Sequence, residues 1–262
     1  MSKFMETYGT ALFVLVLMAI LISFAGPLGL KLKEYTLDRT NNIHEIGRDV
    51  MNDENSSMDT IYACLYTDGE LILSSNEITP NKEVLNNYGT IDLTKTDYDQ
   101  TFPWVELGFK GNNTIKTVNI INEIKPKTCI RMFYNCNNLT QIKNLQNLNT
   151  SACVNMAGMF GCTNSLNLTD LSCFDTSNVV SMQNMFCGSF SKPNNWITND
   201  FLKTLKNWNV SNVKTMENMF FNDKGLTDAS ILLQWKNNGN GLNEQLNTKS
   251  MFNMTNCKNP FE

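Results

Sequence analysis

The sequence contains 262 residues, of which 42% are hydrophobic and 18% are charged. This length suits one or two domains, and the apolar content is enough for a hydrophobic core. The net charge of -4 and the lack of a basic stripe argue against nucleic acid as a partner.

The amino-terminal part, residues 1–30, contains an uncharged apolar run from Thr7 to Leu30. A helix needs about 20 apolar residues to cross the hydrocarbon core of a bilayer. We therefore interpret residues 1–30 as a signal-anchor helix that attaches the protein to a membrane. Two alternatives stay open, a signal peptide cleaved after Ala25 and a buried helix of a soluble fold.

Residues 31–58 are polar with a weak helical pattern, which indicates a juxtamembrane stalk or linker. Residues 59–126 instead have the pattern of short strands. Apolar residues alternate from Ile61 to Leu65, and Asp68-Gly69 separates them from a second apolar run, which together predict a β-hairpin. We interpret residues 59–126 as a β-rich cap over the region that follows.

Residues 127–262 contain a recurring phrase. Its clearest copies are Met156-Ala-Gly-Met159-Phe160, Met182-Gln-Asn-Met185-Phe186 and Met216-Glu-Asn-Met219-Phe220. The first two copies are 26 residues apart and the next step is 34 residues. A period of this length predicts stacked repeats. At the carboxyl end we align Met254 with the first methionine of the phrase, which places Cys257 where the second belongs.

A pattern of the form Leu-x-x-Leu-x-x-aromatic precedes the phrases. Such leucines, together with the methionines and phenylalanines of the phrase, are expected to fill the core between repeats. The residues assigned to this repeat core are Met156, Met159, Phe160, Met182, Met185, Phe186, Met216, Met219, Phe220, Leu145, Leu171, Leu205 and Trp208. A soft-metal site at the paired methionines is the less favoured interpretation.

The third phrase, with its lead-in Asn209-Val-Ser-Asn-Val, resembles the 26-residue repeat of BspA-like leucine-rich repeat surface proteins of bacteria. The Pro103-Trp104 pair, Ile115–Val118 and the Met132–Thr140 segment are similar to the same family. The resemblance implies a mainly β fold with short helical turns, a leucine-rich-repeat-like solenoid behind the β-rich cap, and one amino-terminal transmembrane or signal helix. It also implies display on the cell surface, although the positive charges after residue 30 alone favour the opposite orientation.

An insertion follows the second of these phrases, between Gly188 and Asn199. Insertions in stacked repeats form loops on one face, where an exposed aromatic side chain is a plausible contact anchor. The candidate contact residues are Trp196, Asn195 and Phe190.

The sequence offers little for catalysis. The single histidine, His44, lies in the predicted stalk, which removes histidine-activated nucleophiles from the repeats. Eight cysteines are present without a Cys-x-x-Cys pair, which argues against a zinc site. We interpret them as buried thiols, with disulfides as the alternative. No catalytic residue, cofactor or metal is predicted.

The predicted function is that of a bacterial cell-surface repeat protein that mediates adhesion or binds a protein, host or matrix ligand. The amino-terminal helix would hold it in the cell membrane with an extracellular head, or the protein would be secreted if the signal is cleaved. The alternative is a pilin-like or envelope assembly protein that displays the repeats as a head.

Overall fold

The computed structural model describes residues 59–95, 102–105, 113–239 and 241–261. The predictions for residues 1–30 and 31–58 lie outside these residues. Within them, no helix combines the length and apolar character that crossing a bilayer requires. The described residues belong to one compact unit, which extends from Ser57 to Glu262.

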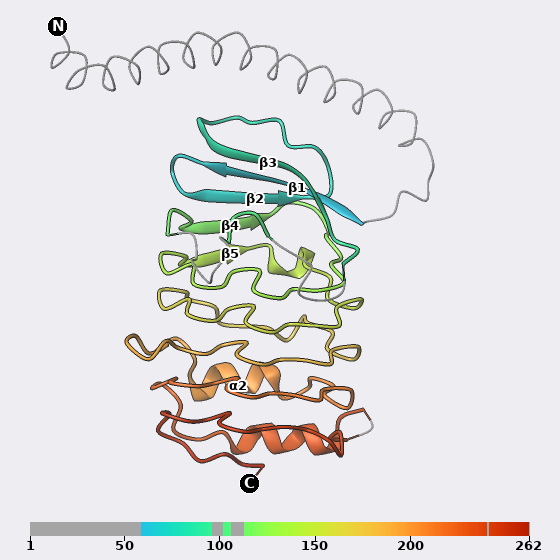
Figure 1. Ribbon diagram of the computed structural model, residues 1–262, viewed down its shortest axis with the longest axis vertical. Coiled ribbons are helices and arrows are strands. Elements are labelled where there is room, and N and C mark those ends of the chain that lie inside the picture. Colours follow the sequence, from blue (N-terminus) through green and yellow to red (C-terminus); the bar gives the residue numbers. More distant parts are fainter. Residues whose placement is uncertain (1–58, 96–101, 106–112, 240, 262) are drawn as a thin grey trace, which may run out of the picture. The chain divides into compact units, whose positions relative to one another are not determined.

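The described residues form one five-stranded mixed sheet, with the spatial order β3-β1-β2-β4-β5 (Figure 1). Strand β2 pairs antiparallel with β1 but parallel with β4, and β5 continues the sheet parallel to β4. The strands are β1 (Thr60–Tyr66), β2 (Glu70–Ser74), β3 (Val84–Asp92), β4 (Thr117–Ile120) and β5 (Gln141–Lys143).

The hairpin predicted around Asp68-Gly69 is confirmed, because β1 and β2 pair antiparallel from Tyr62 opposite Ser74 to Leu65 opposite Leu71. Gly69 has a φ of 92°, and its N–H donates to the Tyr66 carbonyl at 3.0 Å. A Cβ at Gly69 would lie 2.7 Å from the Thr114 carbonyl oxygen. The turn therefore needs glycine for both its conformation and its space.

Beyond β5 the copies of the phrase stack in register through single parallel bridges. The bridged residues occupy the position just before each of five copies, and they are Thr128, Asn155, Ser181, Thr215 and Asn247 in succession. In this count the first copy contains Met132-Phe133, so the copies with Met156, Met182 and Met216 are the second, third and fourth. Alternate backbone N–H groups of one copy donate to carbonyls of the next. Between the second and third copies the donors Met156, Gly158, Phe160 and Cys162 meet the carbonyls of Ser181, Gln183, Met185 and Cys187.

The expectation of a mainly β, leucine-rich-repeat-like solenoid with a separate β-rich cap is wrong. The described residues form a mixed sheet of five strands with few helices, and β5 lies beyond the predicted cap boundary at residue 126. The physical reason is a left-handed residue at the same position of every copy, which stops an extended strand after one bridge. These residues are Arg131 (φ 54°), Gly158 (65°), Asn184 (57°), Asn218 (57°) and Ser250 (56°).

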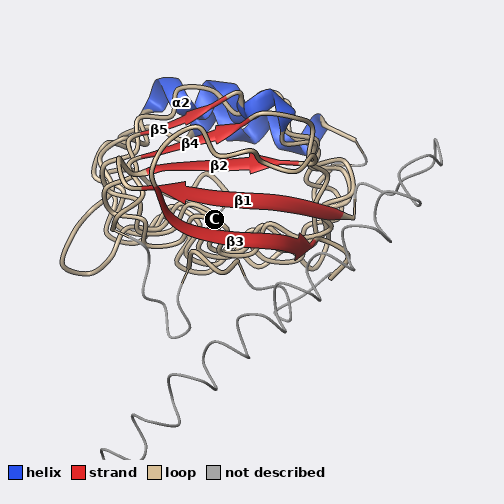
Figure 2. Ribbon diagram, turned by 90° about the horizontal axis from the view of Figure 1, so that it is seen from above, coloured by secondary structure: helices blue, strands red, loops and turns tan. Residues whose placement is uncertain are grey.

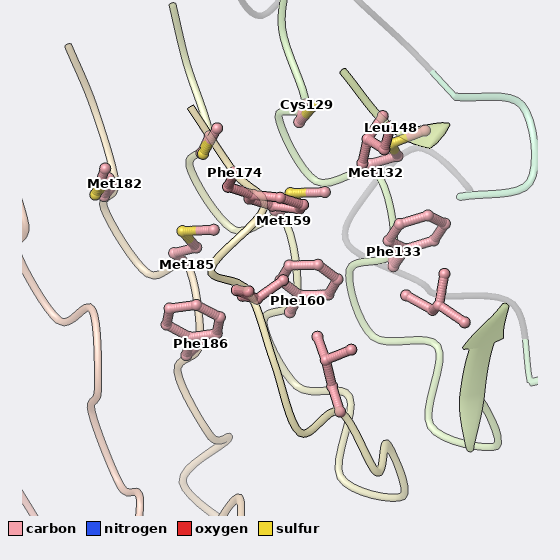
Figure 3. Packing of buried hydrophobic residues seen from close by; sticks show 14 of the residues in the cluster. Cys129, Met132, Phe133, Leu148, Met159, Phe160, Phe174, Met182, Met185 and Phe186 are labelled. Carbon is pink, nitrogen blue, oxygen red and sulfur yellow. The ribbon is translucent and has the colours of Figure 1, made fainter. Parts of the chain in front are cut away.

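A column of stacked phenylalanine rings runs through the core. Phe160 and Phe186 have centroids 5.9 Å apart at an interplanar angle of 1°, and Phe186 and Phe220 are 5.5 Å apart at 13°. Phe133 and Phe252 extend the column at its two ends. Figure 3 shows Phe133, Phe160 and Phe186 in a row, with the methionines of the same copies forming a second row beside them.

The longer spacing of the later copies is taken up partly by helices. Helix α2 (Asn199–Leu205) and the 3-10 helix η2 (Ser230–Asn237) contact each other, and Figure 2 places the helices on the side of the molecule where β5 lies. A shorter 3-10 turn, η1 (Leu145–Asn147), follows β5. Thr198 caps α2 by accepting a hydrogen bond from the Phe201 N–H at 3.2 Å.

The register expected for the last copy is wrong. Asn247 bridges Thr215, and the Phe220 N–H donates to the Met251 carbonyl at 2.9 Å. Met251-Phe252 therefore continues the Met-Phe column, whereas Met254 is 45% exposed. The final copy lacks the first methionine, which is replaced by Thr248 at the position after the bridge.

Trp104 joins its segment to the first copy. Its indole Nε1–H donates to the Met132 carbonyl at 2.7 Å, and its ring packs on Phe102 and Tyr88. Trp208 and Trp235 repeat this contact, since each indole donates to a carbonyl of the preceding copy, Leu171 at 3.1 Å and Leu205 at 2.7 Å. Trp104 therefore joins the preceding segment to the first copy, and Trp208 and Trp235 join neighbouring copies, all through buried hydrogen bonds.

Candidate binding pocket

A pocket of about 530 Å³ lies on one side of the stacked copies. Its walls come from the positions that flank Met-Phe in four successive copies. Because Met and Phe point into the core, the left-handed residue before them and the residues after them face outward. The lining residues are Arg131, Tyr134, Ala157, Gly158, Cys162, Gln183, Asn184, Cys187, Gly188, Ser189, Phe190, Asn218 and Phe221.

Two glycines of the second copy make room for the Tyr134 ring. A Cβ at Gly161 would lie 2.9 Å from Tyr134 Cδ2, and a Cβ at Gly158 would lie 3.4 Å from the same atom. The ring therefore rests on bare backbone. This position brings its hydroxyl to 3.8 Å from the Cys162 sulfur. Burial is the main cause that raises the pKa of the Tyr134 hydroxyl, so this group stays protonated at neutral pH.

Two thiols, Cys162 and Cys187, meet in the pocket wall. The Cys162 N–H donates to the Cys187 carbonyl at 2.7 Å, and both side chains are 7% exposed. A hydrogen bond from the Cys187 thiol lowers the pKa of Cys162 to about 7, against the opposing effect of burial, and Tyr134 adds to the lowering. The same hydrogen bond is the largest cause that raises the pKa of Cys187, and burial raises it further.

All eight cysteines are free thiols, and six of them are buried. This outcome agrees with buried thiols rather than disulfides. Among the described residues, no group of three or more His, Cys, Asp or Glu side chains is arranged to hold a metal ion.

A buried carboxyl group lies behind the pocket. Asp223 and Asn194 face each other across a parallel bridge, and both side chains are fully buried. Neither Asp223 oxygen nor Asn194 Oδ1 has a hydrogen-bond partner. Desolvation raises the pKa of Asp223 well above its ordinary value. A protonated Asp223 would supply the donor that this cluster of acceptors lacks.

The three candidate contact residues have different surroundings. Phe190 lines the pocket, is 83% exposed, and meets Phe221 edge to face at 4.9 Å. Asn195 is exposed but does not line the pocket. Trp196 is partly buried against the core, with its ring edge to face with Phe201 at 5.3 Å. Its buried Nε1 has no hydrogen-bond partner.

All residues assigned to the repeat core are buried, with Leu145 the most exposed at 8% and Leu171 and Leu205 at 0%. The pocket residues Arg131, Tyr134, Cys162 and Cys187 were not singled out as a site. One signal for them existed in the sequence, because they occupy the positions on either side of Met-Phe where the copies differ. The copies are alike at core positions, and their outward positions carry the variation.

These features define a protein of stacked sequence copies with an open pocket on one side. Residues 127–260, just over half of the chain, match the family described as "Mycoplasma protein of unknown function, DUF285". The chain belongs to this family. No curated protein and no solved structure matches the chain.

Proposed function

We propose that this chain is a binding protein that recognises a segment of a protein partner in the pocket beside Phe190. The observation that carries the proposal is the pocket itself, with Phe190 83% exposed at its rim. Pockets that bind ligands commonly have volumes of roughly 300–1,000 Å³. The observed volume of about 530 Å³ therefore suits one or two side chains of a bound peptide.

The chemistry of the lining supports a peptide ligand. Arg131, Tyr134 and Phe221 are residue types enriched at the centres of protein interfaces. Asn184, Asn218 and Gln183 add amide groups that can bind a peptide backbone. A lining of both polar and apolar side chains suits a segment that carries aromatic and polar groups together.

The experiment is selection of a displayed random-peptide library on the full-length protein in detergent, followed by affinity measurement. We expect selected peptides to lose about tenfold or more in affinity for Phe190→Asp, as is common for a central aromatic anchor. The matched control is Leu85→Asp on β3, since Leu85 is also exposed, at 51%, but does not line the pocket. Peptides that bind both variants equally well would overturn the proposal.

We further propose that the chain is displayed at a cell surface, where this binding would act as adhesion. The support is the apolar run Thr7–Leu30 in the sequence, which suits a membrane anchor. Protease treatment of intact cells tests the placement. Cleavage of the repeats while cytoplasmic markers survive is expected, and protection of both would contradict display. The pilin-like alternative stays a prediction, which filament formation by the purified chain would support.

A further inference from the structure

The pair Cys162 and Cys187 differs from the other thiol pair of the fold. Cys129 and Cys153 also contact each other, but both are 0% exposed and neither lines the pocket. Cys162 and Cys187 each keep 7% of their surface exposed and form part of the pocket wall. The structure therefore contains one thiol pair that borders the pocket and one that is enclosed in the core.

The surroundings of the accessible pair distinguish its two members. Tyr134 lies 3.8 Å from the Cys162 sulfur, and its ring is held in place by the bare backbone of Gly161. For Cys187, the hydrogen bond with Cys162 and burial raise the pKa of the thiol, and the Asp223 carboxyl adds a smaller electrostatic effect in the same direction. Cys162 is therefore the thiol that ionises first, and the thiolate is the nucleophilic form of cysteine.

We propose that Cys162 and Cys187 form a thiol–disulfide exchange site, in which the pocket admits a low-molecular-weight disulfide and Cys162 attacks it. This inference does not depend on the proposed peptide-binding function. Cys187 is the resolving thiol. The product is an internal disulfide between the second and third copies of the phrase.

The exchange proceeds in two balanced steps. The Cys162 thiolate attacks one sulfur of the small disulfide, the S–S bond of that molecule breaks, and one small thiolate leaves. Cys187 then loses its proton to the solvent and attacks the Cys162 sulfur, and the second small thiolate leaves. Two protein thiols are oxidised and one small disulfide is reduced to two small thiols.

The fold allows the internal disulfide to form with a local adjustment. Cysteines that form disulfides have Cα atoms about 4.4–6.8 Å apart. The Cys162 N–H donates to the Cys187 carbonyl at 2.7 Å, so the two residues are backbone neighbours on adjacent copies. Formation of the disulfide requires the two side chains to rotate towards each other.

The test is treatment of the full-length protein in detergent with glutathione disulfide at neutral pH, followed by blocking of the remaining thiols and peptide mapping. We expect a Cys162–Cys187 disulfide in the wild type, while Cys129 and Cys153 remain thiols. Cys173 is the internal reference, since it is exposed but burial of its thiol raises its pKa. Cys162 should react about tenfold faster than Cys173 or more. Modification of Cys173 alone, or equal reaction at all sites, would overturn the proposal.

Two variants separate the roles of the residues. In Cys187→Ser the mixed disulfide should remain trapped on Cys162, because no resolving thiol is present. Tyr134→Phe keeps the ring on Gly161 but removes the hydroxyl, and we expect Cys162 to react about threefold to tenfold more slowly near pH 7. The rate should recover at higher pH, where the thiolate forms without this hydrogen bond. A trapped adduct on another cysteine, or an unchanged pH profile in Tyr134→Phe, would contradict the assignment.

Discussion

The sheet and the stacked copies are stabilised in different ways. In the sheet, β1 pairs with β3 from Thr60 to Tyr66, with register shifts after Ala63 and after Leu65, so backbone pairing over many residues sets the positions of the side chains. In the copies, each bridge is one residue long, and a left-handed residue follows three positions later. Side-chain columns carry the packing there, with the phenylalanine rings 5.2–5.9 Å apart along the stack.

This difference shows that a regular period does not require regular strands. Each copy donates alternate N–H groups to the next copy, as a strand would, but its left-handed residue turns the chain before a second bridge forms. The four variants below test how far the two regions differ in what stabilises them.

The largest expected effect is that of Phe186→Ala in the middle of the ring column. Phe186 contacts Phe160 and Phe220 along the stack and Phe201 edge to face at 5.6 Å. Removing the ring should lower the free energy of unfolding by about 3–5 kcal/mol. Chemical denaturation measures the loss. Phe252→Ala is the matched control, because Phe252 has one stacking partner and a smaller loss is expected. Equal losses would show that the column is not the main support.

The sheet depends instead on its hairpin. Gly69→Val places a side chain on a left-handed residue and against the Thr114 carbonyl, so we expect a loss of about 2–4 kcal/mol. Gly89→Ala in β3 is the control, since Gly89 has a φ of 65° but its Cβ would meet nothing within 4 Å. Its loss should be only about 1–2 kcal/mol. Thermal unfolding compares the two, and similar losses would rule out the clash with Thr114.

Asp223 gives a pH-dependent effect in the stacked copies. Burial raises the pKa of its carboxyl in the folded state, so its contribution to stability is complete below the unfolded pKa of about 4. This contribution is lost as the pH rises towards the folded pKa, because the folded state then binds more protons than the unfolded state.

The variant Asp223→Thr tests whether this contribution to stability decreases as the pH rises. Thr163 and Thr255 occupy the same position in other copies, and their hydroxyls donate to the Phe160 and Phe252 carbonyls at 2.6 Å. The variant should be more stable than the wild type by about 1–3 kcal/mol at pH 7, with the difference shrinking towards pH 4. Denaturation at both pH values measures it. A gain of equal size at both values would contradict ionisation as the cause.

The smallest expected effect on stability is that of Phe190→Ala. Because the side chain is 83% exposed, the free energy of unfolding should change by less than about 0.5 kcal/mol. The same variant should weaken binding of pocket-selected peptides. A stability loss comparable to that of Phe252→Ala would mean that Phe190 supports the fold through Phe221 instead of serving the pocket.

Parts of the fold followed from the sequence. Asp68-Gly69 between two apolar runs predicted the hairpin because this pair favours the positive φ that tight hairpin turns commonly use, and Gly69 has a φ of 92°. The shared Met and Phe positions indicated stacking. The error concerned the backbone between them. The resemblance to leucine-rich repeats implied a mainly β fold, whereas Asn184 and Asn218 adopt left-handed conformations, and the sequence shows only that these residues are asparagines. Asparagine tolerates this conformation without requiring it.

The pocket was harder to predict. Phe190 was a candidate because it lies in an insertion, but Trp196 from the same insertion packs against the core. A sequence shows that a side chain is aromatic, and packing decides which way it points.

The sequence by itself determined that copies of one phrase recur and which of their residues are buried, because burial follows the residues that the copies share. The tertiary structure alone decided that Arg131, Tyr134, Cys162 and Cys187 meet, since these residues come from three different copies. It also decided that Cys162 and Cys187 reach the pocket while Cys129 and Cys153 do not. Stacking brings together residues about one period apart, and only the register between copies determines which of them touch.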